Sequence, residues 1–345
     1  MTVEVKTLPL FEAMETLQFP GLKGNLFSSR PWFNVIRAAY HPALFLKYIE
    51  VDGVVRTYVV YTVVRNFLEW KICVLSYSDY CDAFVSSAED WKLLFDSFRR
   101  DYPEYRIALR TFRDAAARAC GLFHELSREY VHTLDLSADI DTLWKGLEGG
   151  FRNQVRQGER RGLVCREGTL ADLWSFYLLH VSLRKRKYRI FAQPFSFFQA
   201  IWKEFIEQGS GFLLCSFDPR GKMVGGNIFL VHEKTLYYKV NTSSAKALDL
   251  RSNNVLMWEG IRRAKERGLT SLDLGSSGRE QDGLVHFKDG TGARRGDIIH
   301  LGYHPPGYVF SRKRILKTYT HLMTQAWVPD AVTRMGSHLI YPFLA

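Results

Sequence analysis

Apolar residues along the first part of the chain change between the spacing of strands and the spacing of helices. Asp52 and Gly53 separate two apolar runs, and Asp-Gly between such runs is a strong β-hairpin signal. Further on, apolar side chains recur at i, i+3, i+4 and i+7, which places them on one face of a helix: Trp91, Leu94, Phe95 and Phe98. The predicted elements are a helix at 30–40, strands at 44–49, 54–64 and 68–75, a helix after Ser87 and a strand at 105–110.

The second part of the chain repeats this order. The predicted elements are a strand at 130–136, helices at about 139–161, 170–182 and 195–208, strands at 212–217, 223–231 and 236–240, a helix ending before Gly268 and a strand at 271–274. Arg110 follows Gly53 by 57 positions, and Leu274 follows Gly221 by 53. The match predicts an internal duplication, the alternative being a chance succession of ordinary α/β elements.

The most informative stretch is 251–292. Ser252 or Asn253 is expected to cap a helix of about four turns, and Gly268 suits the position just beyond its end. A strand follows, and the glycines at 275 and 278 predict a loop that opens a pocket. We expect Lys288 to lie in a second glycine-rich loop beside that pocket.

This stretch resembles the FemAB-like branch of the GNAT N-acyltransferase superfamily. That branch shows Asp-x-Gly at a strand end and then Gly-x-x-x-Phe-Lys-x-x-x-Gly, matched by Asp273, Gly275, Gly283, Phe287, Lys288 and Gly292. Residues 151–162 resemble the Arg-Asn-x-x-Arg helix of the branch, and 327–332 resemble its closing helix. The likeness covers most of 140–335 and is specific for the superfamily rather than for a substrate.

The resemblance implies an α/β fold of two tandem GNAT-like domains, each a mixed sheet with helices on both faces. We expect domain 1 at 1–135, domain 2 with the motif residues at 136–309, and a helical tail at 310–345 that packs on domain 1. Typical Fem ligases also carry a long helical hairpin arm. No paired heptad-like helices of that length are evident here, which weakens the case for a cell-wall precursor as the acceptor.

The charge is uneven. The net charge is +11, yet residues 1–135 hold 16 basic and 17 acidic side chains, while 136–345 hold 31 and 19. Such asymmetry favours a polyanionic partner, with tRNA preferred over a nucleotide or an anionic membrane surface. The alternative is a well-solvated basic surface. We assign tRNA binding to the run Arg184, Lys185, Arg186 and Lys187.

Acyl transfer to an amine needs aligned reactants, a deprotonated nucleophile and a positive group facing the developing oxyanion. The resemblance assigns the last role to Lys288, whereas position alone would favour an exposed loop lysine. Asp273 and Glu259 are candidates for proton transfer, although Asp273 could simply cap the glycine turn. The candidate substrate-binding residues are Arg152, Asn153, Arg156, Asn241, Arg251, Asn253, Gly275 and Phe287.

Several other chemistries are disfavoured. GNATs that bind acyl-CoA place glycines before the central helix, and Asn254 and Leu256 stand there instead. The ten histidines show no metal-binding spacing, so we predict no metal and no cofactor. Five scattered cysteines suggest a reducing compartment, and neither a signal peptide nor a run of about 18 apolar residues is present. We expect a cytoplasmic protein that can touch a membrane surface.

These observations predict transfer of an amino acid from aminoacyl-tRNA to the amine of a small molecule or peptide. One alternative is an acyl-CoA-dependent enzyme that acts on an amino sugar or on a polysaccharide or peptidoglycan precursor. A second is a non-catalytic nucleic-acid-binding protein on a GNAT scaffold.

Overall fold

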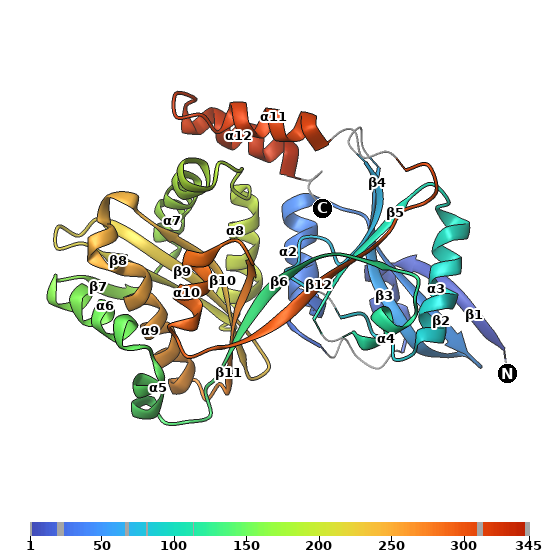
Figure 1. The fold of residues 1–345 in the computed structure, drawn as a ribbon, viewed down its shortest axis with the longest axis horizontal. Coiled ribbons are helices and arrows are strands. Elements are labelled where there is room, and N and C mark those ends of the chain that lie inside the picture. Colours follow the sequence, from blue (N-terminus) through green and yellow to red (C-terminus); the bar gives the residue numbers. More distant parts are fainter. Residues whose placement is uncertain are drawn as a thin grey trace. The chain divides into compact units, whose positions relative to one another are not determined.

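The computed structural model describes residues 2–18, 24–65, 69–80, 82–112, 114–308 and 313–341. The chain forms two compact units (Figure 1). Unit 1 contains 1–128, 297–319 and 340–345, and unit 2 contains 129–296 and 320–339. Each unit is built on a mixed β-sheet with helices against it.

The sheet of unit 1 has the strand order β1-β2-β3-β4-β5-β12. These strands are β1 (Val3–Pro9), β2 (Leu44–Val51), β3 (Val54–Arg65), β4 (Trp70–Val74), β5 (Arg106–Thr111) and β12 (Arg294–Tyr303). Among its described residues, β4 and β5 pair in parallel and the other neighbours pair antiparallel. The predicted hairpin is confirmed, because Asp52 and Gly53 join β2 to β3 with φ values of 48° and 83°. Gly53 takes such a value without strain.

The sheet of unit 2 has the order β7-β8-β9-β10-β11-β6. These strands are β6 (His124–Asp135), β7 (Val164–Glu167), β8 (Gly211–Phe217), β9 (Met223–His232), β10 (Thr235–Ser243) and β11 (Ser271–Gly278). Within the described part of this sheet, β10 and β11 pair in parallel and the other neighbours pair antiparallel. Position by position, this repeats the order and the strand directions of unit 1. The strands at 44–111 and 211–278 therefore bear out the predicted duplication.

The two units exchange their sixth strands. β6 follows the elements of unit 1 along the chain, yet its residues from 129 onward pair with β11 of unit 2. β12 follows the elements of unit 2, yet Ile299 to Tyr303 pair with β5 of unit 1. The predicted boundaries at 135 and 309 differ from the observed ones at 128 and 296. Pairing partners far apart in sequence decide the division, so apolar spacing alone did not reveal it.

The described helices cover both sheets. In the part of the chain before β6 they are α1 (Leu10–Thr16), η1 (Leu26–Ser28), α2 (Arg30–Tyr40), α3 (Ala88–Asp101) and α4 (Ala115–Ala119). After β6 they are α5 (Ile140–Gly146), α6 (Gly149–Arg160), α7 (Leu170–Leu183), η2 (Arg184–Tyr188), α8 (Phe195–Ile201), η3 (Trp202–Ile206), η4 (Ala245–Leu250), α9 (Ser252–Glu266), α10 (Asp282–Asp289), α11 (Lys313–Met323) and α12 (Asp330–Ile340).

Helix α9 occupies the centre of the core of unit 2. Its predicted inward face is confirmed, since Met257, Ile261 and Ala264 are fully buried. Gly260 lies on the same face, where a Cβ would stand 2.4 Å from the ring of Phe229. Glycine therefore lets α9 approach the sheet closely. Gly268, with φ of 66°, follows the end of the helix as expected.

Three local predictions near the site were wrong. Lys288 lies on the helix α10 and not in a glycine-rich loop, because Val285 and Lys288 share an inward face at helical spacing. The run 275–278 continues β11 through an irregularity in its pairing with β6. Arg251, with φ of 55°, precedes α9 where we expected Ser252 or Asn253.

The tail differs from the prediction over most of its length. We expected it to pack on the first domain, but 320–339 group with unit 2. The reason is a set of polar contacts: Lys185 binds Asp330 at 2.8 Å, and Arg189 donates to the carbonyl of Thr324 at 3.1 Å. The described residues 313–319 and the last residues of the tail group with unit 1, where Tyr341 stacks on Tyr40. Residues 309–312, at the start of the tail, lie outside the described residues.

Candidate functional site

The candidate site begins where β10 and β11 part. Their parallel register joins 235–237 to 271–273. Beyond these residues β10 continues against β9 and β11 continues against β6. A register shift at Lys239 in β10 and another after Asp273 in β11 accompany the separation. Backbone and side-chain groups at the carboxyl ends of two neighbouring strands thus become available to a ligand.

Asp273 and Lys288 brace the irregular part of β11 from two sides. The Asp273 carboxylate accepts a hydrogen bond from the Gly275 N–H at 2.7 Å. The Lys288 ammonium donates to the carbonyls of Gly275 and Ser276, both at 2.8 Å. Lys288 is only 2% exposed, so its charge is held inside the protein by these carbonyls. Two of the three predicted catalytic residues therefore meet at this irregularity of the strand, which we call the β11 turn.

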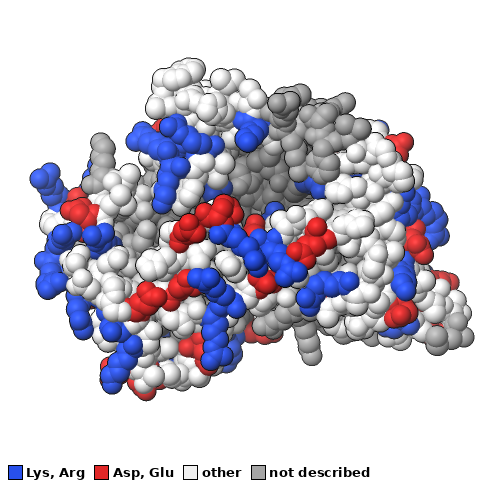
Figure 2. Space-filling model, in the orientation of Figure 1, with Lys and Arg blue, Asp and Glu red and all other residues white. Residues whose placement is uncertain are grey.

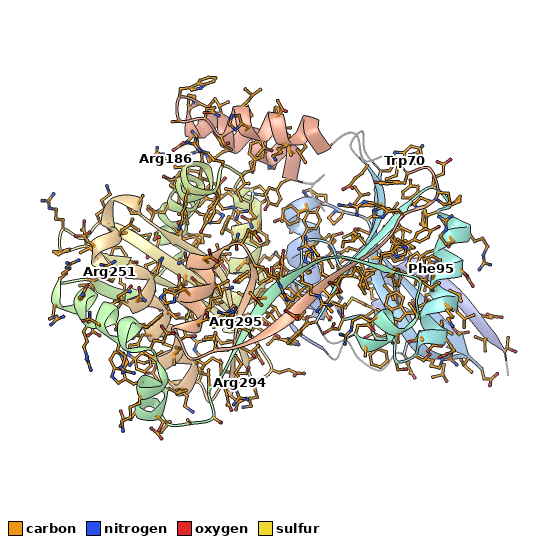
Figure 3. All side chains as sticks on the ribbon, in the orientation of Figure 1. Trp70, Phe95, Arg186, Arg251, Arg294 and Arg295 are labelled. Carbon is orange, nitrogen blue, oxygen red and sulfur yellow. The ribbon has the colours of Figure 1, made fainter. Side chains whose placement is uncertain are left out.

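A cluster of three polar side chains, His132, Asp289 and Arg295, lies next to this turn. His132 of β6 is fully buried, and its Nε2 lies 3.3 Å from Asp289 of α10. Asp289 also accepts from the Arg295 guanidinium on β12 (Figure 3), with one contact at 2.8 Å. Arg295 lowers the pKa of the Asp289 carboxyl by hydrogen bonding. Burial, and then the charge of Lys288, lower the pKa of His132. The imidazole is therefore neutral at neutral pH.

A chain of amide side chains crosses the other strand. The Asn241 Nδ2 of β10 donates to Asn227 Oδ1 at 2.7 Å and to Asn253 Oδ1 at 3.2 Å. Asn253 lies in the first turn of α9, so the chain links β9, β10 and the start of that helix. The structure brings together Asn241 and Asn253 of the predicted set. Sequence reasoning missed Asn227, whose only signal was a polar residue inside an apolar strand.

His180 supports the same strand from the opposite face of the sheet. Gly225 faces Ser252 of α9 and Gly226 faces Phe176 of α7, so the two helices cover opposite faces. His180 of α7 is fully buried, pairs with Gln193 at 2.8 Å and interacts with the backbone of Asn241. Burial lowers the pKa of His180 to about 3. Its ring therefore stays neutral while the protein is folded.

The buried ring of His180 makes stability depend on pH. Between the folded pKa of about 3 and an unfolded value near 6.5, the unfolded chain binds one more proton. The free energy of unfolding should therefore fall as pH is lowered below 6.5, by up to about 1.4 kcal/mol per pH unit from this group. Urea unfolding from pH 7 to pH 5 should show a shallower decline in His180→Gln. Substituting the exposed His286 in the same way should preserve the wild-type decline, and an unchanged slope in His180→Gln would refute the assignment.

Glu259 lies elsewhere than its predicted role requires. It forms ion pairs with Arg262 at 3.0 Å and Arg263 at 3.2 Å on α9. Arg263 also binds Glu167 of the outer strand β7 at 2.7 Å. Glu259 thus belongs to a network of ion pairs that extends to the outer strand β7, whereas Asp273 contacts the β11 turn.

Of the other predicted substrate-binding residues, some support neighbouring elements of the fold and others are exposed to solvent. Arg152 donates to the Lys145 carbonyl at 2.8 Å and to the Leu147 carbonyl, which completes the end of α5. Phe287 packs on Phe151. Asn153 and Arg156 are exposed on α6, with Arg156 over the ring of Trp144, and Arg251 contacts Gln157 at 3.4 Å. Gly275 belongs to the braced turn described above.

The predicted tRNA-binding run is not uniform. Lys185 is buried and donates to Asp330 and to the Val328 carbonyl, so its charge fixes the tail. Arg184 is partly buried and contacts the Phe191 carbonyl at 3.4 Å. Arg186 and Lys187 are exposed. The π-helical turn in which they lie turns successive side chains in different directions, which a run of four letters does not reveal.

Comparison with known proteins agrees with this arrangement. Residues 149–288 match the family described as Acetyltransferase (GNAT) domain. FemX has a similar structure, with 15% identity, a TM-score of 0.64 and coverage of 93% of this chain and 100% of FemX. A tandem GNAT protein from the clavulanic acid biosynthesis pathway is 13% identical, with a TM-score of 0.57 and coverage of 89% of this chain and 100% of that protein. The C-terminal domain of a putative lysylphosphatidylglycerol synthetase from Agrobacterium fabrum is 14% identical, with a TM-score of 0.53 and coverage of 85% of this chain and 92% of that domain.

None of the curated protein sequences matches the chain. The tandem sheets, the parting strands β10 and β11 and the GNAT match define an acyltransferase of the GNAT type. Residues 149–288 therefore carry a GNAT acetyltransferase domain, and the fold of the chain resembles that of FemX, in keeping with the FemAB-like resemblance of the motif around Asp273 and Lys288.

Proposed function

We propose that this acyltransferase moves an amino acid from aminoacyl-tRNA to the amine of a small molecule or peptide. The amine nitrogen attacks the ester carbonyl and forms an N–C bond. The ester C–O bond then breaks, and a proton passes from the attacking nitrogen to the departing ribose oxygen. The protein would supply alignment of the two reactants and a polar environment for the oxyanion.

The structure at the start of α9 is the main support for aminoacyl-tRNA, rather than acyl-CoA, as the donor. Glycine-rich turns at helix starts let a pyrophosphate approach backbone N–H groups. Here Arg251 has left-handed backbone, Ser252 hydrogen-bonds Ser216 at 2.6 Å, and Asn253 accepts from Asn241. Side chains already occupy the turn that CoA would use. This arrangement favours a donor held by other parts of unit 2.

Exposed basic side chains provide such a place. Figure 2 shows Lys and Arg gathered along the outer edge of unit 2, over α5 and α6. Arg156 and Arg160 are exposed on α6, and Arg186 and Lys187 are exposed after α7. Charges along a surface suit the phosphates of a folded RNA, and they make binding dependent on salt. Arg251 and Arg186 are well separated in Figure 3, as an extended ligand requires.

We assign Lys288 a positioning role. Its ammonium is engaged with the carbonyls of Gly275 and Ser276, so it acts by fixing the β11 turn together with Asp273. The amide chain through Asn241 would fix the facing strand in the same way. A reacting group placed between two rigid strands loses little further entropy in the transition state. We assign no proton transfer to Glu259, because its carboxylate is committed to two arginines.

The donor can be tested directly. Purified protein is incubated with labelled aminoacyl-tRNA or labelled acyl-CoA and a mixture of amine acceptors, and amide products are detected by mass spectrometry. We expect products from aminoacyl-tRNA only. The second candidate is an acyl-CoA-dependent enzyme, since residues 149–288 match an acetyltransferase domain. Products from acyl-CoA alone would select that candidate and reject tRNA as donor.

Binding of tRNA should weaken steeply with salt. Each phosphate contact contributes about 0.7 to 0.9 to the slope of log affinity against log salt, so loss of two contacts should lower the slope by about 1.5. We expect this loss in Arg186→Gln/Lys187→Gln and in Arg156→Gln/Arg160→Gln. Arg220→Gln/Lys222→Gln removes two exposed charges from the turn between β8 and β9 and should keep the wild-type slope. Equal slopes in all proteins would remove these patches from the binding surface.

A further inference from the structure

Helix α12 has an unusual orientation within unit 2. Its inward side is formed by Thr333, Gly336 and Ser337, which are small and buried. Thr333 donates to the Met323 carbonyl at 2.9 Å, and Ser337 donates to the Ala192 carbonyl. A surface helix normally turns its apolar side inward and its polar side to water. Here hydrogen bonds fix the polar side, so the apolar side faces outward.

The outward side carries large apolar residues. Met335 is 69% exposed and Leu339 is 66% exposed, and Val332 lies on the same helical face. Trp327, just before the helix, is 78% exposed. We call these four residues the tail face. Contiguous apolar residues left in water indicate a surface that binds a partner.

A second exposed stripe adjoins the tail face. Helix α7 exposes Leu170, Trp174 and Leu178, which recur every four residues on one side. Arg334 of α12 lies over the ring of Trp174, 5.5 Å from its centroid, and so joins the two helices. The apolar surface therefore extends over α7 and α12.

Positive charge borders this surface. Arg334 lies between the two stripes, and Arg189 follows the end of α7, beyond the two basic residues assigned to tRNA. Two nearby acids are already paired, Asp330 with Lys185 and Asp172 with Arg166, both at 2.8 Å. Figure 2 shows the tail as a mostly white surface with a blue group beside it.

We propose that the tail face and the adjoining stripe of α7 bind the surface of an anionic lipid bilayer. Apolar side chains enter the boundary between headgroups and acyl chains, tryptophan favours that depth, and the basic rim contacts lipid phosphates. At 11 residues α12 is about 16 Å long, against a hydrocarbon core of about 30 Å. No helix among the described residues is long and apolar enough to cross a membrane. The helix would thus lie in the plane of the surface.

The test uses the full chain with two kinds of vesicle. One consists of phosphatidylcholine with about 30% phosphatidylglycerol, an anionic lipid, and the other of phosphatidylcholine alone. We expect co-sedimentation mainly with the anionic vesicles, weakening as salt rises. Met335→Asp/Leu339→Asp places two charges in the tail face and should lower vesicle affinity at least tenfold, or about 1.4 kcal/mol.

A matched control variant shows whether two added negative charges weaken vesicle binding wherever they are placed. Val164→Asp/Leu248→Asp makes the same change at two apolar residues of unit 2 with similar exposure, 57% and 61%, and should bind vesicles like the wild type. Both variants should keep the wild-type circular dichroism, because all four side chains face solvent. Equal binding by the tail variant and the wild type would overturn the proposal. So would a wild type that ignores vesicles but forms a dimer that the tail variant abolishes, since the tail face would then bind a second copy.

Discussion

Lys288→Met should lower turnover about 100-fold, because a shift of about 1 Å in the reacting groups can cost that much. Methionine fills similar space but donates no hydrogen bond. The carbonyls of Gly275 and Ser276 would lose the ammonium that holds them, leaving Asp273 to brace the turn alone. Steady-state kinetics with the donor identified above should show the loss in kcat, with donor KM nearly unchanged.

The variant Lys288→Arg distinguishes a role of Lys288 in positioning the reactants from a role in stabilising the fold alone. Lys288→Arg keeps the charge but has a longer, planar head, so it should restore stability more fully than turnover. If Lys288 only supported the fold, Lys288→Met would turn over like the wild type at a temperature where circular dichroism shows it folded. That result would withdraw the positioning role. A rise in KM without loss of kcat would instead make Lys288 a residue for substrate binding.

Lys185→Ala should destabilise unit 2 by about 2 to 3 kcal/mol, because it leaves a buried carbonyl unpaired and opens space beneath the tail. The side chain is 2% exposed and binds both Val328 and Asp330. Asp330 is partly exposed, so its loss of a partner costs less than in a fully buried pair. Urea unfolding followed by tryptophan fluorescence measures the change.

The neighbouring arginine provides the control. Arg186 is exposed and 3.8 Å from the same carboxylate, so Arg186→Ala should change stability by no more than about 0.5 kcal/mol. Its tRNA affinity should fall nonetheless if the basic surface binds RNA. Equal destabilisation by the two variants would show that Lys185 has no special structural role, and the account of how the tail is fixed to unit 2 would fail.

Part of the site was evident in the sequence because its signal was local. The motif placed Asp273, Gly275 and Lys288 in one stretch, and the structure joins them at one turn. The same reasoning chose Glu259 as an acid close to the presumed pocket. A helix turns neighbouring residues toward different surfaces, so Glu259 meets Arg262 and Arg263 instead.

The sequence alone determined the strands, the central helix and their duplicated order, because apolar spacing records which side of an element is buried. It also determined the motif and the excess of positive charge in the second part. Only the tertiary structure decided which strands complete each sheet, since the pairings of β6 and β12 join residues far apart along the chain. It likewise decided that Lys185 is buried while Arg186 is not. It turned the apolar side of α12 outward, because hydrogen bonds from Thr333 and Ser337 outweigh what hydrophobic spacing alone would predict.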